Sequence, residues 1–85
     1  MINSVLAFEE ALKVFTIDQY PLDHAEIINN LGLALQALAE FQNAEDNLAK
    51  AVSHHETASR LYHDKSPIQY ARTLMNIADA ARLFA

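Results

Sequence analysis

The chain has 85 residues, among them no cysteine, no tryptophan, one glycine and two prolines. The absence of cysteine excludes disulfides, thiolate zinc sites and cysteine nucleophiles. Scarce glycine and proline are typical of close-packed helices, and much of the 52% of apolar residues is alanine. We therefore expect one helical domain that is held together by packing, at a length where the burial of surface is marginal.

Long hydrophobic runs and positive charge are also lacking. The longest uncharged stretch lies between Glu26 and Glu40, and it is shorter than the roughly 20 apolar residues that cross a bilayer. Glu9 and Glu10 stand where a signal peptide needs its apolar segment. A net charge of −5 opposes phosphate backbones and anionic lipids. We therefore expect a cytoplasmic protein with no nucleic-acid or membrane partner.

The sequence does contain an internal duplication. The segment that begins at Pro21 returns 46 residues later at Pro67. The identical pairs are Pro21 and Pro67, Ala25 and Ala71, Asn30 and Asn76, and Ala34 and Ala80, and the similar pairs are Leu22 and Ile68, Ile28 and Leu74, and Leu31 and Ile77. A repeat of this length indicates helical units that bury their apolar faces by stacking on neighbours.

Apolar residues at spacings of three and four predict an all-α chain of four antiparallel helices. They cover about residues 3–15, 22–39, 43–62 and the segment from Ser66 onward. Asn3 or Ser4 is expected to cap the first helix, and Asn43 the third, while Ser66 before Pro67 is typical of a helix start.

Each predicted helix has an apolar face for packing against its neighbours. In chain order the faces comprise Val5, Phe8, Leu12 and Phe15; Ile28, Leu31, Leu35 and Leu38; Ala44, Leu48, Ala51, His55, Ala58 and Tyr62; and Tyr70, Leu74, Ile77, Ala81 and Phe84.

Six of these residues, together with Gly32, carry the pattern of a known family. They are Ile28, Leu31, Gly32, Leu35, Ala44, Leu48 and Ala51. With these residues the unit from about Leu22 to Tyr62 resembles a tetratricopeptide repeat, although Leu35 and Leu48 stand where aromatics are usual. The phrase Pro-x-x-His-Ala-x-x-x-Asn-Asn-Leu-Gly-x-Ala-Leu looks like a long-period bacterial variant of that family. The resemblance implies a helical-hairpin solenoid fragment: a half repeat over about 1–20, a full repeat over 21–65 and a half repeat over 66–85.

The same resemblance implies protein binding and self-association. Members of the family bind peptides or partner helices along the surface made by successive first helices of their repeats. In this chain that surface comprises Glu26, Asn29, Leu33, Gln36, Arg72, Met75, Asp79 and Arg82. The other interpretation of these residues is a solvated or self-contacting face. Since such arrays need about three repeats, the chain is either part of a longer array or a homo-oligomer, most simply a dimer.

Two features inside the helices require a physical reason. Gly32 costs roughly 0.5 to 1 kcal/mol relative to alanine in a helix, and close approach of another helix supplies a reason, with Ala78 keeping the small size in the second copy. Asn30 and Asn76 occupy equivalent places, so each is expected either to bond a neighbouring helix or to contact a bound peptide.

Chemistry of other kinds has little support. His24, His54, His55 and His63 suggest a metal site, but adjacent histidines on a helix point about 100° apart and no Glu-x-x-His pair is present. No phosphate-binding loop or nucleophile elbow occurs. We expect no cofactor, no metal and no catalysis. A purely structural oligomerisation unit is the first alternative to a binding module, and a metal-dependent helix-bundle enzyme is the remote one.

Overall fold

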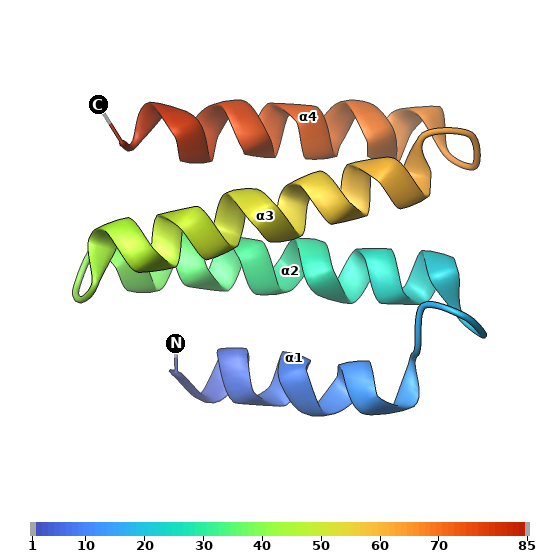
Figure 1. The fold of residues 1–85 in the computed structure, drawn as a ribbon, viewed down its shortest axis with the longest axis horizontal. Coiled ribbons are helices and arrows are strands. Elements are labelled where there is room, and N and C mark those ends of the chain that lie inside the picture. Colours follow the sequence, from blue (N-terminus) through green and yellow to red (C-terminus); the bar gives the residue numbers. More distant parts are fainter. Residues whose placement is uncertain (1, 85) are drawn as a thin grey trace.

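The computed structural model describes residues 2–84, and side chains from Ser4 onward. Four α-helices occupy almost all of this range, and it contains no strand: α1 at Ile2–Val14, α2 at Pro21–Ala39, α3 at Ala44–Tyr62 and α4 at Pro67–Arg82 (Figure 1). The predicted all-α class is thereby confirmed, and the predicted helix boundaries agree to within about two residues.

Two of the three connections have the predicted local signals. Pro21 and Pro67 lie in the first turns of α2 and α4, where a missing N–H costs nothing and the fixed φ suits the helix. Between α2 and α3, Asn43 adopts a left-handed backbone with φ of 46°, a conformation that asparagine tolerates better than most residues.

The predicted side-chain caps are wrong. Asn43 and Ser66 do precede α3 and α4, but neither side chain makes a capping hydrogen bond. A capping residue normally has an extended backbone, whereas Asn43 is left-handed. At the amino end of the chain α1 already begins at Ile2, so Asn3 and Ser4 lie within the helix.

The helices lie side by side in chain order, with α1 and α4 at the two edges (Figure 1). Each helix packs against the next one in the chain, and α2 also touches α4. The Cα atoms extend over 34 × 26 × 14 Å. In such a slab α2 and α3 are enclosed on several sides, whereas each edge helix has one face without a neighbour.

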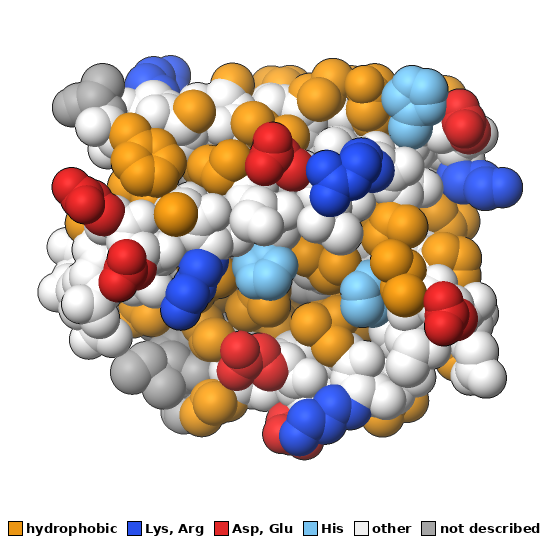
Figure 2. Space-filling view, in the orientation of Figure 1, with side chains coloured by type: hydrophobic (Ala, Val, Ile, Leu, Met, Phe, Trp, Pro, Cys, Tyr) orange, Lys and Arg blue, Asp and Glu red, His pale blue; other side chains and the backbone are white. Residues whose placement is uncertain are grey.

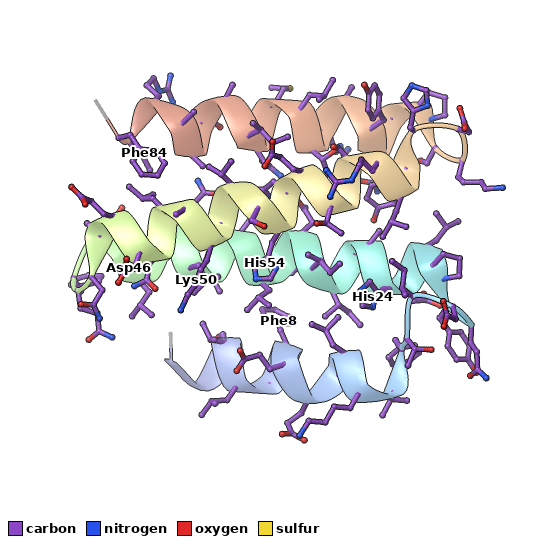
Figure 3. The ribbon with its side chains drawn as sticks, in the orientation of Figure 1. Phe8, His24, Asp46, Lys50, His54 and Phe84 are labelled. Atoms are coloured by element: carbon purple, nitrogen blue, oxygen red, sulfur yellow. The ribbon has the colours of Figure 1, made fainter. Side chains whose placement is uncertain are left out.

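The core sits between α2 and α3. One cluster joins Ala25, Ala58 and Tyr62, and a second joins Leu31, Leu35 and Ala51 and receives Val5, Phe8 and Leu12 of α1. In Figure 3 the labelled Phe8 accordingly points from α1 toward the neighbouring helices. The predicted faces of α2 and α3 are confirmed, except that Leu38 is half-buried and Ala44 is exposed.

The predicted face of α4 is wrong. Only Thr73 and Ala80 of this helix are buried, whereas Leu74 is 44% exposed and Phe84 51% exposed. The reason is that α3 covers one side of α4, and no helix of the described range covers the opposite side. Tyr70 alone of the predicted set packs against a core cluster. In residues 2–84 no helix combines the length and the apolarity needed to cross a bilayer.

Candidate functional site: a groove between α2 and α4

A groove of about 450 Å³ is lined by residues of α2 and α4, two helices that touch each other at few points. Its lining consists of Glu26, Asn29, Asn30, Leu33, Gln69, Arg72, Met75, Asn76 and Asp79. Most of these side chains are polar, and four of them end in a carboxamide. The groove can therefore offer hydrogen-bond donors and acceptors in close succession.

The structure brings six of the eight predicted binding residues to this groove: Glu26, Asn29, Leu33, Arg72, Met75 and Asp79. Gln36 and Arg82 do not line it. Gln36 instead reaches the ring of His55, and Arg82 donates to Asp79 over 3.0 Å at the surface. An ion pair as exposed as Arg82 with Asp79 contributes little to stability.

Asn29 and Asn76 form the floor of the groove. A hydrogen bond between α2 and α4 holds this floor in place. The Nδ2 of Asn76 in α4 donates to the Oδ1 of Asn29 in α2 over 3.0 Å. The same oxygen lies 2.8 Å from Nδ1 of His55 in α3. One amide thus joins three helices, and it holds α4 at a set distance from α2 although the two helices share few contacts.

His55 lies fully buried beneath this floor. Burial, followed by the nearby His54, lowers its pKa from 6.5 to about 4, so the ring is neutral near pH 7. A neutral imidazole donates from one nitrogen and accepts at the other. Because Asn29 Oδ1 already accepts from Asn76, His55 Nδ1 is the donor. The Nε2 of His55 lies 2.5 Å from Oε1 of Gln36. Because a neutral ring that donates from Nδ1 accepts at Nε2, this bond requires the Gln36 amide to be turned so that its nitrogen faces the ring.

The position of the His55 ring explains why residue 32 is a glycine. A Cβ placed on Gly32 would lie 2.6 Å from Cε1 of His55, closer than any stable contact. The predicted reason for Gly32, close approach of a helix, is thus correct in kind, but the group that approaches is the buried imidazole of α3.

The two equivalent asparagines have different surroundings. Asn76 bonds across to α2, which is the structural interpretation of the pair. Asn30 lines the groove with a half-buried side chain, and none of the side-chain hydrogen bonds found among residues 4–84 involves it. Its amide is therefore the one better placed for a ligand.

Sequence reasoning missed the partnership of His55 with Asn29 and Gln36. A signal for it was present, because Asn29, Gly32 and Gln36 are spaced at three and four and therefore share one helical face. A glycine leaves space for a flat ring to pack against the helix, and an amide on each side of it can form a hydrogen bond with that ring. Gln69 was also missed, and nothing in the sequence distinguishes it.

The groove carries charge of both signs. Glu26 and Asp79 contribute carboxylates and Arg72 a guanidinium, and within the described residues Arg72 forms no ion pair. In the same range no three His, Asp or Glu side chains gather closely enough to hold a metal ion. The arrangement suits hydrogen bonding and ion pairing with a ligand of mixed polarity.

Removal of the Asn29 amide tests whether its hydrogen bonds in the floor of the groove stabilise the protein. We expect Asn29→Ala to lower the free energy of unfolding by about 1 to 2 kcal/mol, because it leaves a buried imidazole nitrogen without its partner. Asn30→Ala, one residue away on the same helix, is the matched control and should change it by less than about 0.5 kcal/mol. Urea denaturation of both variants checks this, and equal effects would show that the amide of Asn29 has no special role.

Comparison of the chain with protein-family models, with curated proteins and with solved structures finds no match.

Proposed function

We propose that this protein is a protein-interaction module that binds an extended segment of a partner protein in the groove between α2 and α4. The observation that carries the proposal is the convergence of six predicted binding residues on one groove whose floor is held by Asn29, Asn76 and His55. A prearranged floor lowers the ordering cost of binding.

The chemistry of the lining suits a peptide backbone. An extended peptide offers alternating N–H and C=O groups, and the amides of Asn30 and Gln69 can each donate and accept. Leu33 is 42% exposed and Met75 67% exposed, so both can contact apolar side chains of the ligand. Arg72 is suited to an acidic residue of the ligand, because guanidinium and carboxylate form charge-assisted bonds.

We also propose that the four helices are a tetratricopeptide-like array in which α2 and α4 are equivalent first helices. The duplication at Pro21 and Pro67 supports this, as does the contact of each helix with the next in the chain. In such an array the equivalent helices lie along one side, and a groove lined by α2 and α4 agrees with this.

Selection from a phage-displayed library of random peptides tests the binding proposal. We expect peptides with an acidic residue to be enriched, and their affinity to fall at least about tenfold in Arg72→Glu, which corresponds to about 1.4 kcal/mol. Arg60→Glu is the matched control, since it makes the same change at an exposed arginine of α3 outside the groove. Fluorescence anisotropy measures both. No enrichment, or equal losses in both variants, would overturn the proposal.

A purely structural role in oligomerisation is the second candidate. It is favoured by the large apolar side chains that remain exposed on the edge helices, among them Leu6, Val14, Ile68 and Leu74.

A further inference from the structure

The edge helix α4 has a mostly apolar face on which no other helix of residues 2–84 packs. The face comprises Ala71, Leu74, Met75, Ala78, Ala81 and Arg82, all of them exposed. Leu74 and Met75 are 44% and 67% exposed. Hydrophobic side chains accordingly gather along α4 at the edge of the slab in Figure 2. We call this surface the open face of α4.

The duplication shows what covers the equivalent face elsewhere in the chain. The counterparts of Ala71, Leu74, Ala78 and Ala81 in α2 are Ala25, Ile28, Gly32 and Leu35. These four are buried, and α3 packs on three of them: Tyr62 on Ala25, His55 on Gly32 and Ala51 on Leu35. A face of this kind therefore binds a helix of the α3 kind.

The chain contains one other helix of that kind, namely α1. Glu9, Ala11, Lys13, Val14 and Phe15 line up with Glu56, Ala58, Arg60, Leu61 and Tyr62. The face of α1 that corresponds to the α2-binding side of α3 comprises Ser4, Phe8, Ala11, Val14 and Phe15. α1 packs on the second core cluster through Val5, Phe8 and Leu12, so Phe8 and Ala11 are half-buried. The part of this face that stays open is its carboxyl end, where Val14 is 65% exposed and Phe15 37% exposed.

The side chains on these two open faces match each other chemically. In the pair of α2 and α3, an imidazole is flanked by two amides, those of Asn29 and Gln36. At the equivalent places α1 has Phe8, which is half-buried against the second core cluster, and α4 has Met75 and Arg82. A phenyl ring thus replaces the imidazole, and a thioether and a guanidinium replace the two amides. Thioethers and guanidinium groups both interact favourably with aromatic rings. The substitutions on the two helices are thus mutually compatible.

We propose that the open face of α4 binds α1 of a second copy of this chain, in the register in which α2 binds α3. The core of the contact is Ala71 of one copy against Ala11, Val14 and Phe15 of the other. Charge favours the pairing, because α1 carries two acids and one base and α4 carries two bases and one acid. The contact joins different surfaces, so it extends head to tail into chains or closed rings.

Two single substitutions block the two faces separately. Ala71→Arg places a long cation on the open face of α4, and Val14→Arg does the same on α1. Both positions are exposed in the single chain, so neither change disturbs the core. Ser53→Arg, at an exposed position on α3, adds the same charge away from both faces and is the control. Circular dichroism verifies that every variant keeps its helix content.

Sedimentation equilibrium of the 85-residue chain gives the decisive readout. We expect the mass of the unaltered chain and of Ser53→Arg to rise with concentration beyond that of a dimer. Each blocked variant alone should keep the mass of one chain. An equimolar mixture of the two blocked variants should form a dimer and stop there, because one intact α4 face and one intact α1 face remain.

Other outcomes overturn the proposal. An unaltered chain that stays monomeric up to millimolar concentration would show that the open faces do not bind each other. A Val14→Arg variant that still dimerises, with no complex in the mixture, would show a symmetric contact between two α4 helices. Ala78→Arg and Ser4→Arg are a second pair at exposed positions on the same two faces, and they should reproduce the result of the first pair.

Discussion

Replacement of Gly32 by alanine is expected to destabilise the protein by about 1 to 3 kcal/mol, although alanine is the better helix former. The added Cβ would lie 2.6 Å from Cε1 of His55 and 2.9 Å from each ring nitrogen. The ring cannot yield easily, because it is fully buried and held from both sides by Asn29 and Gln36. Urea denaturation at neutral pH measures the loss.

A second variant separates this contact from general effects of the substitution. In a His55→Ala background the obstacle is gone, so Gly32→Ala should become neutral or stabilise by up to about 1 kcal/mol through helix propensity. Ala78→Gly, the reverse change at the exposed equivalent position on α4, should cost no more than about 1 kcal/mol. A destabilisation by Gly32→Ala that is the same with and without the imidazole would show that His55 does not determine the size of residue 32.

Acid is expected to unfold the protein through the same histidine. The pKa of His55 in the folded state is about 4 against an ordinary value of 6.5, because burial disfavours the charged ring and His54 adds to the effect. Between these two pH values the unfolded chain takes up a proton that the folded chain does not. The stability due to the neutral ring is therefore complete above about pH 6.5, and it is lost as the pH falls toward about 4.

The expected loss over this range is about 2 to 3 kcal/mol, a large part of the stability of a small domain. Neighbouring groups contribute as well: burial also lowers the pKa of His54, which Glu9 raises and Lys50 lowers. A His55→Gln variant isolates the role of His55, since it keeps a hydrogen-bonding side chain that does not titrate. The free energy of unfolding should vary less with pH in this variant than in the unaltered chain, and parallel pH profiles would contradict the assignment.

The buried faces of α2 and α3 could be predicted from periodicity. Both helices are enclosed by their neighbours, so their apolar residues are buried in the core between them. For α4 the same method failed. Its apolar residues lie on both sides of the helix, and only the contact with α3 decides which of them are buried. Periodicity shows that Leu74 and Ala81 share a face, but it does not show whether anything covers that face.

The groove could be located from the resemblance to a tetratricopeptide repeat, which implies a binding surface along the first helices of successive repeats, and six of the eight implied residues line it. Its floor could not be predicted in the same way. The bond between Asn76 and Asn29 joins positions that are not equivalent in the two copies, so the repeat gives no indication of it. Gln36 and Arg82 are likewise equivalent to each other, but both lie beyond the groove: a buried imidazole engages Gln36, and Arg82 pairs with Asp79.

The central claim, that the groove between α2 and α4 binds an extended peptide, is tested most directly by NMR. A peptide enriched from the random library would be titrated into isotopically labelled protein. We expect the side-chain amide signals of Asn30 and Gln69 and the methyl signal of Met75 to shift, while the amides of Gln42 and Asn43 in the exposed connection stay in place. Shifts confined to α1 or to that connection, with the groove signals unmoved, would contradict the claim.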